Sequence, residues 1–119
     1  MKKRSVVPPS GGSLDETVIR ALKEDEGFRM EYLKDLLQEE DVKLMAIALR
    51  PLVEALGGIG KLSSETGLGR QSLYKSLSGK VRPDFPTLLK IIHFAGYDLS
   101  VDRRRPSKRH SRSLAGSRS

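Results

Sequence analysis

The chain has no cysteine, no tryptophan, only two histidines and no long apolar run. Without cysteine it forms neither a disulfide nor a thiolate metal site, so a reducing cytosol suits it. Two scattered histidines, His93 and His110, do not make a metal site. No apolar run approaches the ~18 residues of a membrane-spanning helix, and VVPP follows the basic start MKKR where a signal peptide would be apolar. We therefore expect a cytoplasmic protein without a metal or a membrane span.

Patterns typical of enzymes are also missing. The run GGIGK at residues 57–61 has the glycines and the lysine of a phosphate-binding loop. That pattern, however, requires Gly at the position of Ala55 and Ser or Thr at the position of Leu62. No Ser, His and Asp occur at a spacing that indicates a catalytic set, and solvation explains the carboxylates on the helix faces. We predict that the chain is not an enzyme and binds no cofactor.

The net charge of +7 is distributed unevenly. Residues 1–4 carry +3 and residues 102–119 carry +6. Residues 13–57 hold six basic and eleven acidic side chains, a net −5, whereas residues 58–90 hold six basic and two acidic side chains, a net +4. An acidic half therefore precedes a basic half, and a basic surface is the electrostatic footprint of nucleic-acid binding.

Both ends of the chain have the composition of disordered segments. Residues 1–12 combine a basic start with prolines and a glycine pair, and residues 102–119 are basic and of low complexity. The tail either has no specific role or adds phosphate contacts that do not depend on DNA sequence. The 119 residues, of which 37% are hydrophobic, then leave room for one domain with a modest core.

Two short amphipathic helices are expected in the acidic region, residues 13–40. Ser13 and Glu16 form a capping-box pattern that predicts a helix from Leu14 to about Gly27. A second apolar stripe follows, made by Phe28, Tyr32, Leu33, Leu36 and Leu37. Because both helices are short, they must pack on something larger.

A third helix should begin after Asp41, which is a good N-cap residue. Pro51 lies inside it and lacks an amide donor, so we expect a kink or a break near Arg50. The glycine pair at residues 57–58 should end this helix.

A last helix is expected after Asp84, again a capping residue, and should end at Gly96. Residues 97–101, YDLSV, alternate apolar and polar side chains, which indicates a short half-buried strand.

Residues 59–79, IGKLSSETGLGRQSLYKSLSG, indicate two short helices joined by a tight turn. Gly67 marks the turn, where a positive φ lets the first helix end, and the second helix should run from about Arg70 to Leu77. The inward positions fit this division better than one continuous helix: Leu62, Thr66, Leu68, Leu73 and Leu77. The outward face of the second helix has hydrogen-bond donors and no acidic residue, as a recognition helix in the DNA major groove requires. The alternative is an ordinary helical hairpin with a solvated basic face.

The stretch ETGLGRQSLYKSLSG, followed by Pro83 and TLLKII, resembles the HigA-like antitoxins, also called addiction-module antidote proteins. The resemblance covers roughly residues 30–101. It implies an all-α fold in which residues 41–101 form a λ-repressor-like helix-turn-helix DNA-binding domain, with two preceding helices and a short C-terminal strand. Family members usually have Ser where Gly69 stands and Ala where Ser63 stands. The first departure weakens the cap of the recognition helix.

The resemblance also implies a function. The chain would be an antitoxin of a type II toxin–antitoxin module that neutralises a RelE/ParE-like toxin and represses its own operon by binding DNA, usually as a homodimer. Such toxins are typically basic, so the acidic half suits this partner. Residues 97–101 are a candidate dimer contact, because an unpaired strand edge can pair with its symmetry mate. The main alternative is a stand-alone regulator, phage-derived and without a toxin, and the second is an adaptor that contacts protein or RNA.

The predicted site residues follow from these helices. Base contacts are expected from the outward face of the recognition helix: Arg70, Gln71, Tyr74 and Lys75. Phosphate contacts are expected from this helix and from the ends of the motif: Lys61, Ser72, Lys80 and Arg82. The toxin is expected to bind acidic residues that follow a spacing of four and would share one helix face: Glu31, Asp35 and Glu39.

Overall fold

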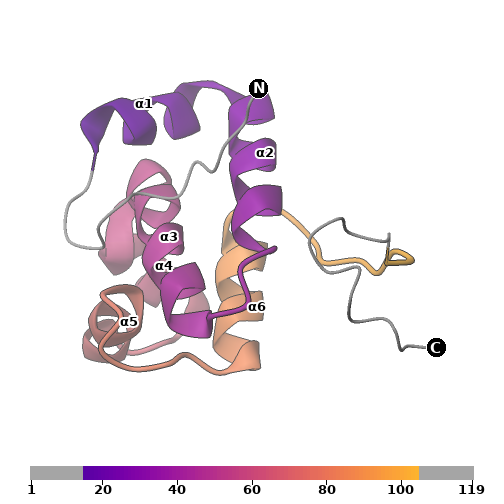
Figure 1. Cartoon of the computed structure of the whole chain (residues 1–119). Coiled ribbons are helices and arrows are strands. Elements are labelled where there is room, and N and C mark those ends of the chain that lie inside the picture. Colours follow the sequence, from indigo (N-terminus) through magenta and orange to yellow (C-terminus); the bar gives the residue numbers. More distant parts are fainter. Residues whose placement is uncertain (1–14, 105–119) are drawn as a thin grey trace.

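The computed structural model describes residues 15–104, which fold into six α-helices without a strand (Figure 1). The helices are α1 (Glu16–Glu24), α2 (Glu26–Leu36), α3 (Val42–Ala55), α4 (Gly58–Thr66), α5 (Arg70–Leu77) and α6 (Phe85–Phe94). This arrangement confirms the prediction of an all-α fold. None of the six is long and apolar enough to cross a membrane.

α3 is the central helix, and α1, α2, α4 and α5 all pack against it, while α6 packs on α4. Fully buried side chains from all six helices form one core, including Leu22, Leu36, Leu49, Leu62, Leu73 and Ile91. Burial of one such aliphatic side chain stabilises the fold by about 1.5–3 kcal/mol. The two acidic helices, which contribute Leu22 and Leu36, therefore share their core with the rest of the chain.

Asp25 separates the first two helices and serves both of them. Its backbone N–H donates to the Ala21 carbonyl at the end of α1, and its side chain accepts from the Phe28 amide, 3.1 Å away, at the start of α2. α1 therefore ends at Glu24 and not near Gly27 as predicted.

The start of α1 also differs from the prediction. Asp15 has extended backbone angles, and its side chain accepts from the Thr17 amide over 2.9 Å, so the helix begins at Glu16. Ser13 and Leu14, which were predicted to start it, lie outside the described residues.

α3 runs unbroken through Pro51, so of the predicted kink or break near Arg50 the break is wrong. An interior proline costs a helix about 3 kcal/mol, because it cannot donate to the carbonyl one turn back. Leu49, Leu52 and Val53, on either side of Pro51, are buried in the core. Their burial outweighs this cost and keeps the helix intact. Asp41 caps α3 as predicted and accepts from the Lys43 amide over 2.9 Å.

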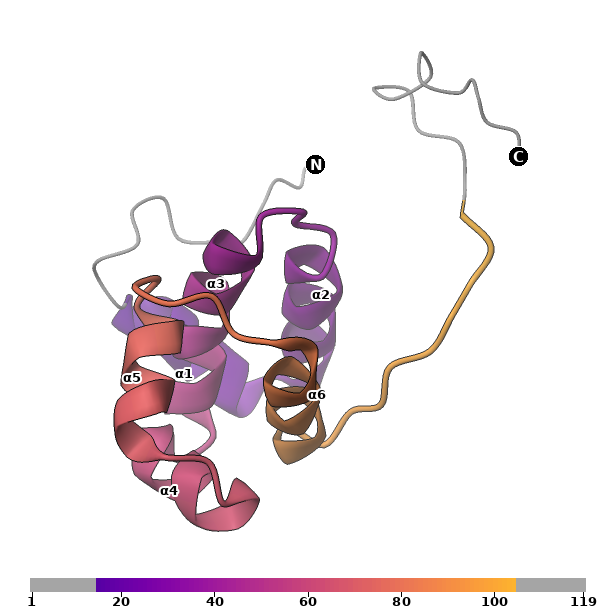
Figure 2. The ribbon, with the colours of Figure 1, turned by 90° about the horizontal axis from the view of Figure 1, so that it is seen from below.

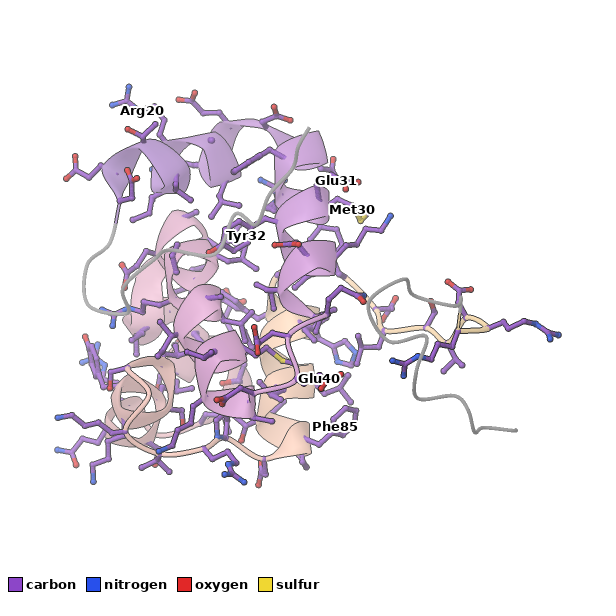
Figure 3. All side chains as sticks on the ribbon, in the orientation of Figure 1. Arg20, Met30, Glu31, Tyr32, Glu40 and Phe85 are labelled. Carbon is purple, nitrogen blue, oxygen red and sulfur yellow. The ribbon has the colours of Figure 1, made fainter. Side chains whose placement is uncertain are left out.

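Tyr32 joins α2 to α3 and points into the interior of the molecule (Figure 3). Its hydroxyl donates to the Ala48 carbonyl over 2.7 Å. Burial, helped by the negative charge of Asp35, raises the pKa of Tyr32 above its ordinary value. The residue therefore acts as a neutral hydrogen-bond donor inside the core.

The C-terminal part of the described chain confirms one prediction and corrects another. Asp84 caps α6 by accepting from the Thr87 amide over 3.0 Å, and hydrogen bonds from the Thr87 side chain and amide lower the pKa of Asp84. After Gly96, which has φ of 93°, residues 97–101 do not form the expected strand. Figures 1 and 2 show this segment leaving the helices with no strand of residues 15–104 beside it, so its backbone has no ladder to join.

Candidate nucleic-acid interface

α4 and α5 are joined by residues 67–69, as the sequence predicted. Gly67 ends α4 with φ of 80°, a left-handed conformation that suits glycine, and its amide donates to the Ser63 carbonyl over 2.9 Å. The turn reverses the chain, so that α5 packs on α4 and on α3.

Two hydroxyl groups fix the geometry of this turn. The Ser63 hydroxyl donates to the Leu68 carbonyl over 2.6 Å. The Thr66 hydroxyl donates to the Leu62 carbonyl over 2.6 Å and accepts from the Leu68 amide over 3.2 Å. Ser63 was noted only as a departure from the family pattern, and its role in the turn was missed. The available signal was its place four residues before the glycine that ends the helix.

α5 has one buried face and one exposed face. Leu73, Ser76 and Leu77 are buried against the rest of the fold. The exposed side chains are the five that were predicted to contact DNA from this helix: Arg70, Gln71, Ser72, Tyr74 and Lys75. Gly69 is the N-cap and makes no side-chain hydrogen bond, as expected for this departure from Ser. The structure thus brings the predicted base-contacting residues together on one short helix.

Arg70 lies close to α4 as well as on α5. Its Nη2 atom is 2.8 Å from the place that a Cβ on Gly60 would occupy, so the guanidinium rests over the backbone of α4. A Cβ at position 60 would require the Arg70 guanidinium to shift away from α4. Arg70 therefore occupies the edge of the surface where α4 and α5 meet.

The predicted phosphate-contacting residues surround this helix. Lys80 and Arg82 are exposed in the loop after α5, and the Lys80 amide donates to the Lys75 carbonyl over 3.0 Å. Lys61 is exposed on α4, where its amine lies 4.0 Å from the Glu65 carboxylate. No acidic residue occurs between residues 66 and 83. The local charge of this surface is therefore positive, although Glu65 partly offsets Lys61.

Sequence reasoning also missed a contact between α3 and α5. The guanidinium carbon of Arg50 lies 5.4 Å from the centroid of the Tyr74 ring. The Arg50 Nε donates to a Glu54 carboxylate oxygen over 2.8 Å. Arg50 and Glu54 are only partly exposed, whereas Tyr74 is 49% exposed. The spacing of four residues between Arg50 and Glu54 would have predicted the ion pair. No pattern in the sequence predicts the contact between Arg50 and Tyr74.

The predicted toxin-binding residues do not share one helix face. Glu31 is exposed on α2, 4.0 Å from the Lys34 amine, and points away from the molecule in Figure 3. Asp35 is half-buried on the same helix. α2 ends at Leu36, however, and Glu39 lies in the following loop, where its carboxylate accepts from the Asp41 amide over 3.0 Å. The prediction that all three lie on one face is wrong, because the helix ends before the third residue.

Most acidic residues of the N-terminal helices lie at the opposite end of the molecule from α5, whereas Glu40 lies toward the end where Phe85 begins α6 (Figure 3). Figure 1 places α1 and the start of α2 at one end and α5 at the other. Residues 15–31, which include α1 and the start of α2, hold six acidic and three basic side chains, a net −3. Two ligands of opposite charge could therefore bind without competing for one surface.

No group of His, Cys, Asp and Glu within residues 15–104 is arranged to hold a metal ion.

The fold and this surface define a small all-α protein with a basic, acid-free face on one short helix. The family model described as "Probable addiction module antidote protein" matches residues 15–103. The chain therefore belongs to this family of addiction module antidotes. An uncharacterized protein from Haemophilus influenzae is 30% identical over 91 residues, which cover 76% of this chain and 92% of that protein. No solved structure matches the chain.

Proposed function

We propose that the chain is the antitoxin of a type II toxin–antitoxin module and has two binding surfaces. In this proposal α5 binds operator DNA, and the acidic helices α1 and α2 bind a basic RelE/ParE-like toxin. Membership of the antidote family favours this function over a stand-alone regulator. The observation that supports DNA binding most strongly is the exposed face of α5, which carries Arg70, Gln71, Tyr74 and Lys75 within an acid-free stretch.

The proposed DNA complex treats α4 and α5 as a λ-repressor-like helix-turn-helix, with α5 in the major groove. Arg70 or Lys75 would contact guanine and Gln71 would contact adenine, and each well-formed bidentate pair discriminates by about 1–3 kcal/mol. Lys80 and Arg82 would hold phosphates on either side of the groove. Two copies of the chain, with recognition helices about 34–36 Å apart, would read a palindromic operator and repress the operon.

Competition binding tests the DNA-binding part of this function. The full chain is titrated into a duplex from upstream of its own gene, with unrelated DNA as competitor. Arg70→Ala should lower the preference for the operator roughly 5- to 150-fold, the loss expected for one bidentate arginine. The matched control is Arg20→Ala, which removes the same charge from the outward side of α1 at the opposite end of the molecule (Figure 3). Equal effects of the two substitutions, or an unchanged preference with Arg70→Ala, would contradict the proposal.

The toxin-binding part predicts that a small basic protein is encoded next to this chain. The net charge of −3 on residues 15–31, which include α1, the start of α2 and their capping residues Asp15 and Asp25, would steer such a toxin to this end of the molecule and raise the rate of association. Glu31 and Glu65 form a matched pair for testing this idea. Each is exposed on a helix with a lysine amine 4.0 Å away, but Glu31 lies on acidic α2 and Glu65 lies on α4.

Association rates of the toxin with the full-length variants are therefore compared over a range of salt concentrations. Glu31→Lys should slow association and flatten its salt dependence, whereas Glu65→Lys should leave both nearly unchanged. An equal change in both variants would indicate only a net-charge effect. Unaltered binding of the toxin by Glu31→Lys would move the toxin site away from α2.

A further inference from the structure

Tyr74 is the aromatic residue of α5, and its ring contacts a charged side chain from another helix. It is 49% exposed, and the guanidinium carbon of Arg50, from α3, lies 5.4 Å from its ring centroid. This distance is within the range of a cation–π contact. Within residues 15–104 the Tyr74 hydroxyl makes no hydrogen bond, so the outer edge of the side chain is available to a ligand.

Arg50 is itself held in place by Glu54, one turn further along α3. Its Nε donates to the carboxylate over 2.8 Å, and the two side chains are 24% and 28% exposed. A hydrogen bond at Nε fixes the plane of the guanidinium, because this nitrogen is part of the rigid fork. Glu54 also neutralises the charge of Arg50. The pair therefore adds no net charge to the surface of α5, and phosphate binding does not explain it.

We propose that Glu54 and Arg50 are positioning residues that hold the Tyr74 ring in the orientation in which it contacts DNA. This inference rests on the proposed DNA-binding function of α5. A tyrosine on an exposed helix face can rotate about χ1 and χ2, and ordering it on binding costs free energy. Stacking on a fixed guanidinium selects one orientation before DNA arrives, which reduces that cost. The orientation of one base-facing side chain therefore depends on two residues of α3.

The test removes the support without changing the charge of the protein. Arg50→Met with Glu54→Gln eliminates one positive and one negative side chain and keeps similar volumes. The double substitution is made with Tyr74 present and again with Tyr74→Ala, and each full-length protein is titrated with operator DNA and with unrelated DNA. Loss of the support should weaken operator binding about three- to tenfold when Tyr74 is present, the change expected from ordering one side chain.

Three comparisons distinguish positioning from a purely structural role. In the Tyr74→Ala background the double substitution should have no further effect, because the side chain to be positioned is gone. Binding to unrelated DNA and its salt dependence should stay unchanged in both backgrounds. The NMR signals of the Tyr74 ring in the free protein should shift when Arg50 is replaced, because the guanidinium no longer lies on the ring.

The same experiment gives two distinct negative results. An equal loss with and without Tyr74, or no loss with Tyr74 present, overturns the positioning role while the DNA-binding function stands. A wild-type chain that does not prefer operator DNA overturns the proposed function, and this inference with it. Should the double substitution unfold the chain, Glu54→Met alone carries the comparison between the two backgrounds, since it removes the acceptor that orients the guanidinium and changes the net charge equally with and without Tyr74.

Discussion

Replacing Tyr32 with phenylalanine removes one hydroxyl from the contact between α2 and α3 and leaves the ring in the core. The hydroxyl donates to the Ala48 carbonyl over 2.7 Å, and the residue is fully buried. A hydrogen bond between neutral groups contributes about 0.5–1.5 kcal/mol to stability. Ala48 lies inside α3, where its carbonyl also accepts a backbone hydrogen bond of the helix. The substitution therefore does not leave the Ala48 carbonyl without a hydrogen-bond donor. We therefore expect Tyr32→Phe to lower the free energy of unfolding by about 1 kcal/mol near pH 7.

The pH dependence of stability provides a second, independent part of this prediction. Burial raises the pKa of Tyr32, so the folded chain keeps the phenolic proton at pH values where the unfolded chain has lost it. Wild-type stability should consequently fall as the pH rises above ~10, by up to ~1.4 kcal/mol per pH unit from this group. Phenylalanine has no proton to release. The stability difference between the two proteins should therefore shrink in alkaline solution.

Urea denaturation of both proteins between about pH 7 and pH 11 measures both effects, since the ordinary tyrosine pKa is ~10. Near neutral pH the thermal midpoint of Tyr32→Phe should also lie roughly 4–8 °C lower, as expected for about 1 kcal/mol in a domain of this size. Equal stability near pH 7 would show that the hydrogen bond contributes nothing. A difference that stays constant or widens above pH 10 would refute the argument that burial keeps this phenol protonated.

Two further predictions concern the loop after α5. Gly79→Ala should destabilise the fold more than Gly67→Ala. Both glycines have φ near +80°, but a Cβ on Gly79 would lie 2.7 Å from Ile47 Cδ1, whereas a Cβ on Gly67 would meet nothing within 4 Å. We expect a loss of about 1 kcal/mol for Gly67→Ala and of about 2 kcal/mol or more for Gly79→Ala in urea denaturation, and equal losses would exclude the clash. Lys80→Gln with Arg82→Gln should weaken binding to all DNA sequences alike and lower the salt slope by roughly 0.9 per lost phosphate contact. A loss confined to the operator would instead identify these residues as base readers.

Local signals in the sequence predicted much of this fold. Asp41 and Asp84 cap the helices for which they were predicted, and Gly67 adopts the positive φ expected at the turn. The bounds of α5 agree with the prediction of residues 70–77. These features depend on backbone geometry and on hydrogen bonds between residues close in the chain. They can therefore be read without knowledge of the tertiary structure.

Features that depend on distant residues were not predicted. α3 continues through Pro51 because the core on both sides of it is well packed. The strand expected after Gly96 is absent because no neighbouring strand of residues 15–104 pairs with it. The contact between Arg50 and Tyr74 joins two helices that lie far apart in the sequence. Each of these outcomes is decided by tertiary packing, which overrides local propensity.

The candidate site was predicted only in part for the same reason. The exposed residues of α5 were identified correctly, because they follow from helix periodicity. The acidic face was misjudged because the spacing of Glu31, Asp35 and Glu39 has meaning only while one helix continues, and α2 ends at Leu36. The helix closes there with hydrogen bonds from the Gln38 and Glu39 amides to the Asp35 and Leu36 carbonyls, a tight last turn that the sequence alone did not reveal.

Amide chemical-shift mapping tests the proposed contact between α5 and DNA most directly. A duplex from upstream of the gene is added to the isotope-labelled full chain, and each backbone amide is followed. The largest changes should fall within residues 67–82, which contain α5 and its flanking loops, and the amides of α1 and of the start of α2 should stay unchanged. Changes concentrated on α1 and α2, with residues 67–82 unaffected, would contradict the proposed contact.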